Sequence, residues 1–284
     1  MTTHLECGAK VWRWDREMKE DGVQRLAPGW LTHLLKRFAY QDQGEPFVLP
    51  APLRPLWVIG DLHGRADLLD RLLKEMFART ARDAVDIVFT GDYIDRGPDS
   101  AEVLSRLRHL SDTLRSVTCL IGNHEQMMFD FLDDPAAHGR RWLRYGGHST
   151  LGSYGLVCKR TQTSDAHLQD LATDLLNAMG HDTLTWLRQR PLLWRSGNVA
   201  VVHAALDPGR DVDDQLPGTM LWGHPLFFNT ARQDGLWVAH GHTIVDKPGP
   251  TGRGRIAVDT GAYDTGRLTG VLILPDGTVT PLST

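Results

Sequence analysis

Short apolar runs alternate with longer helical patterns from residue 56 onward. Three of these runs, at 56–59, 85–90 and 117–121, are each followed directly by a glycine. Short continuous apolar runs bounded by turn residues are typical of strands that are buried on both faces. Apolar residues at helical spacing follow each run, as between Leu68 and Met76. Three strand–loop–helix units predict an α/β fold with parallel strands joined by right-handed crossovers.

The pattern differs on either side of these units. Residues 1–55 contain one short amphipathic pattern, at 29–40, and end in a proline-rich connector, which predicts an amino-terminal extension. Residues 136–190 are predicted to be mainly helical. Strand patterns return in the last third of the chain, and they predict antiparallel additions or a second sheet. These later runs are 199–202, 236–239, 256–258 and 271–274.

Composition and charge exclude several classes of partner. Of the 284 residues, 41% are hydrophobic and 23% are charged, as in globular proteins. A formal net charge of −4 argues against nucleic-acid binding, and the lack of a long apolar run argues against a membrane partner. The first twenty residues do not resemble a secretory signal. Cys7, Cys119 and Cys158 are odd in number and widely spaced, so the expected compartment is a reducing cytoplasm.

Polar side chains suited to metal binding gather where the apolar runs end. The set comprises Asp61, His63, Asp92, Asp95, Arg96, Asn123, His124, His203 and His242. Ligands of open α/β sheets bind at the carboxyl ends of strands, so we expect these residues to share one pocket. Carboxylate, imidazole and amide groups suit hard-to-borderline divalent metals. Two ions need a bridging carboxylate, and a phosphate ester needs its charge neutralised, and this set supplies both.

The loops that carry these residues resemble the signature motifs of the phosphoprotein phosphatases, within the calcineurin-like metallophosphoesterases. The three motifs are GDLHG at 60–64, GDYIDRG at 91–97 and GNHE at 122–125. VVHAAL at 201–206 and HGHT at 240–243 are similar to the remaining metal positions, and YGGHSTLGSYG at 145–155 and IAVDTGAY at 256–263 to segments of bacterial members. The match covers about residues 56–274. It implies a central β-sandwich of mixed sheets flanked by helices, with a catalytic domain at 56–284 and a helical insertion at about 136–190.

The resemblance implies a role for each matched position. One metal ion would be bound by Asp61, His63 and Asp92. The second would be bound by Asp92, Asn123, His203 and His242, with Asp92 bridging the two ions. Arg96 would hold the phosphate, and His124, oriented by Asp95, would be the general acid. Two divalent cations are expected, with manganese preferred and iron or zinc as alternatives.

Two positions depart from the family pattern. Many members have a second phosphate-binding arginine after an apolar-Trp segment, whereas Trp222-Gly223 is followed here by His224. We expect His224 to provide a weaker phosphate clamp, and the alternative is an arginine from the helical insertion, namely Arg140, Arg141 or Arg144. Ala205 stands where glycine is common, and its methyl group should not remove the ligand His203.

Other polar residues in the motifs have less specific interpretations. Glu125 could hydrogen-bond to neighbours of the acid, but charge complementation at a helix N-terminus explains it equally well. His240 is interpreted as structural, because only His242 matches a ligand position of the family.

Three functions are compatible with this sequence. The leading interpretation is a phosphomonoesterase that hydrolyses phosphoserine or phosphothreonine in a phosphoprotein or phosphopeptide, by attack of a hydroxide that bridges the two ions. The second is a symmetrical dinucleoside tetraphosphate hydrolase from a related branch, which usually lacks the pair seen at Asp95 and Arg96. The third is a non-catalytic scaffold, which would be expected to lose metal ligands or the acid, and none is missing here. The complete set therefore favours the phosphomonoesterase.

Overall fold

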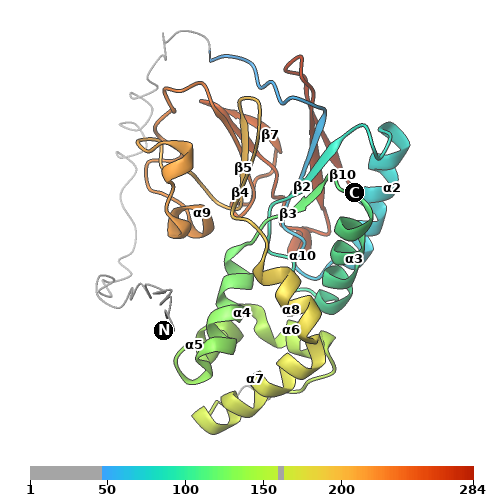
Figure 1. Ribbon diagram of the computed structural model, residues 1–284, viewed down its shortest axis with the longest axis vertical. Coiled ribbons are helices and arrows are strands. Elements are labelled where there is room, and N and C mark those ends of the chain that lie inside the picture. Colours follow the sequence, from blue (N-terminus) through green and yellow to red (C-terminus); the bar gives the residue numbers. More distant parts are fainter. Residues whose placement is uncertain (1–46, 159–162) are drawn as a thin grey trace, which may run out of the picture. The chain divides into compact units, whose positions relative to one another are not determined.

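Two five-stranded sheets contain the strands of the chain that the computed structural model describes, residues 47–158 and 163–284 (Figure 1). The first sheet has the order β10-β9-β1-β2-β3 and the second has the order β4-β5-β6-β8-β7. The first contains β1 (Leu56–Ile59), β2 (Asp86–Phe89), β3 (Val117–Cys119), β9 (Thr269–Ile273) and β10 (Val279–Ser283). The second contains β4 (Leu193–Ser196), β5 (Val199–Val202), β6 (Trp237–His240), β7 (Gly249–Gly252) and β8 (Arg255–Ala257). The predicted helix at 29–40 lies outside the described residues.

Each sheet contains three adjacent strands that run parallel to one another. β1, β2 and β3 run parallel in the first sheet, as do β5, β6 and β8 in the second. The other four strands, β9, β10, β4 and β7, pair antiparallel. The prediction of a sandwich of mixed sheets is therefore confirmed. Loops that follow the parallel strands carry the polar residues singled out from the sequence.

The side chains of β1 show how the layers pack. Leu56 and Val58 are buried between the two sheets, in a cluster that includes Ile256 of β8. Trp57 and Ile59 point to the other face and belong to the cluster that includes the helices. Because both faces are covered, the strand is apolar throughout rather than alternating with polar residues. Each large apolar side chain buried in this way contributes about 1.5–3 kcal/mol to folding.

Helices that follow the parallel strands of the first sheet pack in the same core. Figure 1 shows α2 (Ala66–Arg79) and α3 (Ser100–Thr113) beside this sheet, after β1 and β2 respectively. Their buried faces contain leucines at helical spacing, including Leu68 and Leu72 of α2 and Leu104 of α3. The helix α4 (Asn123–Asp133) begins two residues after Ile121, and its first two residues belong to the predicted site.

A group of helices occupies most of the segment that the sequence predicts to be helical. They are α5 (Pro135–Trp142), the π-helical turn η2 (Leu143–Gly147), α6 (His148–Ser153), α7 (Asp165–Met179) and α8 (His181–Arg188). In Figure 1 they lie with α4 at one end of the two sheets. Asp134 starts α5 by accepting a hydrogen bond from the backbone N–H of Ala137 (3.1 Å).

Three short helical elements lie in the last third of the chain. They are η3 (Val212–Asp214), α9 (Pro217–Trp222) and α10 (Ala262–Thr265). Among the described residues, no helix has both the length and the apolar character needed to cross a membrane.

Candidate functional site

Backbone and side-chain hydrogen bonds join the loops that follow the parallel strands. Within the first sheet, the N–H of His63 donates to the carbonyl of Asp92 (2.8 Å). Between the sheets, the N–H of His242 donates to the carboxylate of Asp61 (3.1 Å). The imidazole of His203 contacts the carbonyl of Thr90 through Nδ1 (3.0 Å). The expectation that separate chain segments meet at one pocket therefore agrees with the geometry.

The backbone of these loops is strained at the predicted site residues. Six non-glycine residues have a positive φ in the described part of the chain, and five of them belong to the predicted site. The five are His63 (42°), Asp92 (53°), Asp95 (70°), Arg96 (67°) and His242 (61°). Such backbone conformations cost about 1–3 kcal/mol each and persist where the surrounding structure holds them, commonly at functional sites. The strain is thus concentrated where the chemistry is expected.

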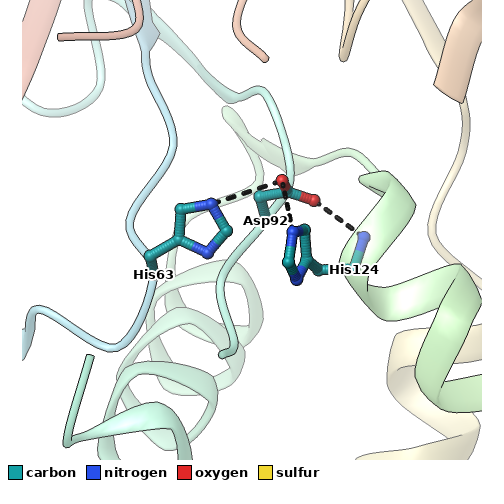
Figure 2. A group of neighbouring side chains, drawn as sticks. All are labelled: His63, Asp92 and His124. Atoms are coloured by element: carbon teal, nitrogen blue, oxygen red, sulfur yellow. Dashed lines mark hydrogen bonds and ion pairs between the residues drawn. The ribbon is translucent and has the colours of Figure 1, made fainter. Parts of the chain in front are cut away.

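Asp92 lies at the centre of this cluster of side chains, and Figure 2 shows two of the imidazoles around it. Its Oδ2 lies 3.4 Å from Nε2 of His63 and 3.9 Å from Nε2 of His124. Its Oδ1 accepts the backbone N–H of His124 (3.0 Å) and lies 3.6 Å from Nε2 of His203. One carboxylate therefore faces imidazole nitrogens from three separate chain segments, and its two oxygens lie near the two predicted ligands His63 and His203, as a bridging carboxylate requires.

Two of the imidazoles are held in the tautomer that binds metal ions through Nε2. Nδ1 of His63 contacts the carbonyl of Ile94 (2.8 Å), and Nδ1 of His203 contacts that of Thr90. A carbonyl can only accept, so each Nδ1 carries the proton and each Nε2 presents a lone pair towards Asp92. Burial lowers the pKa of His63 to about 3 and that of His203 to about 4. Both rings are therefore neutral at physiological pH, the form that binds metals.

Several hydrogen-bond acceptors lie close together around His203, in the predicted second metal site. Nε2 of His203 lies 2.8 Å from Oδ1 of Asn123 and 3.2 Å from Nδ1 of His242. In the tautomer set by Thr90, the first of these contacts joins two lone pairs, an arrangement that a shared cation stabilises. Burial, followed by the nearby carboxylates of Asp259 and Asp92, raises the pKa of Asp61. This excess of buried acceptors fits a site for positive charge.

Two groups of residues can each hold a metal ion. The groups are His63, Asp92 and His124, and Asp92, His203 and His242, with donor atoms within 4.8 Å of one another in each group. Asp92 is shared, as the sequence predicts, but the first group contains His124 where Asp61 was expected. Asp61 instead accepts hydrogen bonds from His242 and from the hydroxyl of Thr90 (3.1 Å). The donor types and their spacing fit the expected pair of divalent ions.

His124 and Asp95 are in contact, as their expected roles of general acid and orienting carboxylate require. Nδ1 of His124 lies 2.7 Å from Oδ2 of Asp95, and both side chains are buried. Burial acts to lower the pKa of His124, but the carboxylates of Asp92 and Asp95 outweigh it and raise the pKa above its usual value. The pair therefore favours the protonated imidazole, the form that can donate a proton.

Arg96 lies between the two imidazoles of the first metal group. Its Nη1 is 3.1 Å from Nε2 of His63, and its Nη2 is 3.1 Å from Nε2 of His124. The guanidinium also stacks over the ring of Tyr263, 4.6 Å from the centroid. Arg96 is thus a planar cation fixed beside His124, and its role as the phosphate-binding residue stays a prediction.

His224, the expected second phosphate-binding residue, makes its contacts with other residues. Its Nδ1 accepts the N–H of Leu226 (3.3 Å), and its Nε2 lies 3.7 Å from the carboxylate of Asp207. Among the alternatives, Arg140 pairs with Asp165 (2.6 Å), and Arg141 stacks over the ring of Trp222 (4.9 Å). No hydrogen bond or ion pair among the described residues joins His224, Arg140, Arg141 or Arg144 to Arg96 or His124, and the second clamp stays a prediction.

Glu125 has a larger part in the site than the sequence indicates. Its carboxylate accepts backbone N–H groups from Asp92 (2.8 Å), Tyr93 (2.8 Å) and Gly122 (2.9 Å). Burial above all raises its pKa to about 7. These bonds tie the loop that contains Asp92 to the start of α4. The signal in the sequence was its position three residues into a helix, directly after His124.

Other residues that the sequence left without a role lie in or near two quoted segments. Tyr263 comes from IAVDTGAY, and its ring also meets that of His63 edge to face, with centroids 5.3 Å apart. Thr150 lies within YGGHSTLGSYG and Trp142 lies three residues before it, and the side chains of both donate a hydrogen bond to the carboxylate of Asp95. His240 is buried against Phe227 and Phe228, consistent with the structural interpretation.

A pocket with a shared carboxylate, neutral imidazoles and an arginine beside an acid pair is typical of metal-dependent phosphoesterases. The chain belongs to the calcineurin-like phosphoesterase family, whose model matches residues 54–246. The identification made from the sequence motifs is thereby confirmed at the level of this family.

Relatives of known name divide between two substrate types. The symmetrical bis(5'-nucleosyl)-tetraphosphatase of Acidovorax sp. (strain JS42) is 31% identical over 165 residues, which are 57% of this chain and 47% of the relative. Serine/threonine-protein phosphatase 1 of Salmonella typhimurium is 38% identical over 94 residues, 33% of this chain and 39% of the relative. The chain thus spans about half the length, or less, of these curated relatives.

A solved structure confirms the fold independently. A protein named provisionally as a diadenosine tetraphosphatase superposes with a TM-score of 0.57 at 21% identity, over 83% of this chain and 96% of its own. At this level of identity, the likeness concerns the fold alone.

Proposed function

We propose that this chain hydrolyses phosphoserine and phosphothreonine esters in proteins or peptides, with two divalent cations as cofactors. The observation that carries the proposal is the buried contact of 2.7 Å between His124 and Asp95. A serine or threonine alkoxide is a poor leaving group, so its departure requires a proton from a positioned acid. A carboxylate that raises the pKa of the imidazole keeps that proton available.

Each remaining residue has a task in this reaction. When bound, the two cations activate a water molecule and neutralise the charge on the phosphate oxygens. The residues that would hold them are Asp61, His63, Asp92, Asn123, His203 and His242. Arg96 would bind the phosphate beside Nε2 of His124, which lies 3.1 Å from its Nη2. Manganese is the first choice of cation, because oxygen and nitrogen ligands without thiolate suit it.

A symmetrical dinucleoside tetraphosphatase activity is the second candidate. It is supported by the 31% identity to the Acidovorax protein of that name. A polyphosphate leaving group carries its charge on phosphate oxygens at neutral pH and needs an acid less than an alkoxide does. The tight acid pair therefore favours the monoester, while the relatives favour the anhydride.

Rates on three substrates separate these candidates. The 284-residue chain with manganese would be assayed on a phosphothreonine peptide, on diadenosine tetraphosphate and on 4-nitrophenyl phosphate. We expect kcat/KM to be at least about tenfold higher for the peptide than for the dinucleotide. A dinucleotide rate tenfold above the peptide rate would overturn the proposal in favour of the second candidate. Asp92→Asn serves as the inactive control for contaminating phosphatases.

A further inference from the structure

Both carboxylate oxygens of Asp95 are held by side chains of the helical segment that follows α4. The hydroxyl of Thr150 in α6 donates to Oδ1 (2.6 Å), and the indole N–H of Trp142 at the end of α5 donates to Oδ2 (3.0 Å). Oδ2 is the same oxygen that contacts Nδ1 of His124. All of these side chains are buried, so water does not compete for the bonds.

Thr150 also holds the backbone of the same residue. The N–H of Asp95 donates to the hydroxyl oxygens of Thr150 (2.9 Å) and Ser100 (3.1 Å). Thr150 therefore contacts Asp95 on both sides of its Cα, which fixes the rotation of the carboxylate about the side-chain bonds. Asp95 has φ 70°, a conformation that needs such external support in a non-glycine residue.

The turn between α5 and α6 is built for close approach to this loop. The N–H of Arg96 donates to the carbonyl of Gly146 (3.4 Å), and Gly146 has φ 121°. A Cβ at Gly146 would lie 2.8 Å from the backbone nitrogen of Arg96, and one at Gly147 would lie 2.6 Å from the ring of Trp142. Only glycine allows the two segments to meet so closely. The contact between the turn and the acid loop is therefore specified by the sequence.

We propose that Trp142 and Thr150 are positioning residues for the general acid. They hold the carboxylate of Asp95 in the one orientation in which Oδ2 faces Nδ1 of His124, and Nε2 then faces the phosphate site. The helical insertion thereby controls proton donation to the leaving group, although neither side chain touches the substrate. This inference depends on the acid role of His124, which is part of the proposed function.

The test compares substrates that differ in their need for an acid. Alkyl phosphates need a proton on the leaving oxygen, whereas 4-nitrophenolate leaves readily without one. The Thr150→Val, Thr150→Ser and Trp142→Phe variants of the manganese-loaded 284-residue chain would be assayed on a phosphothreonine peptide and on 4-nitrophenyl phosphate. Trp186→Phe is the matched control, because this buried indole donates to the hydroxyl of Ser111 (3.1 Å) rather than to Asp95. Thermal unfolding and bound manganese per chain are measured for each variant.

We expect Thr150→Val and Trp142→Phe each to lower kcat/KM about tenfold or more on the peptide and less than about threefold on the aryl ester, since acid catalysis contributes about 10²–10⁴-fold in total. Thr150→Ser restores the peptide rate, and Trp186→Phe leaves the ratio of the two rates unchanged. Equal losses on the two substrates in folded, metal-loaded variants would overturn the inference, as would no loss. Thr150→Val preserves volume, so it carries the test if Trp142→Phe unfolds.

His124→Asn separates failure of this inference from failure of the proposed function. If His124→Asn selectively lowers the peptide rate while both positioning variants retain the wild-type ratio, only the positioning role is overturned. If His124→Asn lowers both rates equally, the acid role itself fails, and the positioning role fails with it.

Discussion

The loops at the strand ends and the helical insertion contribute to the site in different ways. The loops after β1, β2, β3, β5 and β6 supply every predicted metal ligand. The insertion supplies none of them, yet its Trp142 and Thr150 hold the carboxylate of Asp95. The comparison teaches that one region carries the reactive groups and the other fixes their orientation. The first task needs special residue types, whereas the second needs only good packing and hydrogen bonding.

The two regions also reach their geometry by different means. Five loop residues adopt left-handed backbone conformations, which are costly in non-glycine residues. The insertion instead uses Gly146 and Gly147, which allow a close approach without a side chain in the way. Substitutions in the loops should therefore affect chemistry first, and those in the insertion should affect the alignment of the acid.

The largest effect is expected for Asp92→Asn, which tests the loops at their centre. Removing the shared negative charge should lower kcat by about 10³-fold or more and reduce bound manganese, because an amide is uncharged and has one acceptor oxygen, so it cannot bridge two cations. Steady-state rates with excess manganese and elemental analysis of the purified protein measure the two effects. Asp86→Asn, on the preceding strand and paired with Arg54, is the matched control. Unchanged turnover would remove Asp92 from the mechanism.

The next largest effect is expected for His124→Asn, which tests where the two regions meet. The rate on alkyl phosphates should fall about 10²–10³-fold, and the rate on aryl phosphates should fall much less, because the acid serves the leaving group. A series of monoesters with leaving groups of increasing basicity measures this difference, as the slope of log(kcat/KM) against the basicity of the leaving group. His109→Asn, on α3, is the matched control. A slope identical to that of the wild type would contradict an acid role.

The sequence predicted the loops well because each one combines a buried strand with residues of recognisable chemistry. β1 begins and ends at the predicted residues, Leu56 and Ile59, and the strand-end glycines, histidines and aspartates mark the site directly. The strands that were not predicted, β4, β7 and β10, lie at sheet edges. β7 contains two glycines and a proline, and β10 contains Pro281, so their pairing depends on neighbours rather than on their own composition.

The positioning residues could not be predicted for a related reason. Tryptophan and threonine within a helical pattern are most simply interpreted as core residues, and nothing in their spacing indicates a carboxylate 47 or 55 residues away in the chain. The hydrogen-bonding role of Glu125 could not be predicted either, because a glutamate early in a helix is already explained by its favourable interaction with the helix dipole. Such roles arise from tertiary contacts, which a single sequence does not display.

A smaller effect is expected for Glu125→Gln, which loosens the connection between one loop and α4. The amide retains a single acceptor oxygen for the four backbone N–H groups that the carboxylate accepts, those of Asp92, Tyr93, Ile94 and Gly122. Loss of these bonds in a buried position should lower the free energy of unfolding by about 1–3 kcal/mol. Urea denaturation measures this change, and Glu102→Gln on the exposed face of α3 is the control. Equal stability of the Glu125→Gln and wild-type proteins would show that the backbone groups find other partners.

The smallest effect is expected for His224→Ala, which tests whether a third region contributes to phosphate binding. Because the ring of His224 is engaged by Leu226 and Asp207, its removal should raise KM for the peptide by less than about threefold and leave kcat unchanged. A rise in KM of tenfold or more would instead support the phosphate clamp expected from the sequence. Arg141→Ala is assayed in parallel. If Arg141 of the insertion provides the second phosphate contact, this variant raises KM and His224→Ala does not. The pair of variants therefore decides whether Arg96 binds the phosphate alone or with help from either side of the pocket.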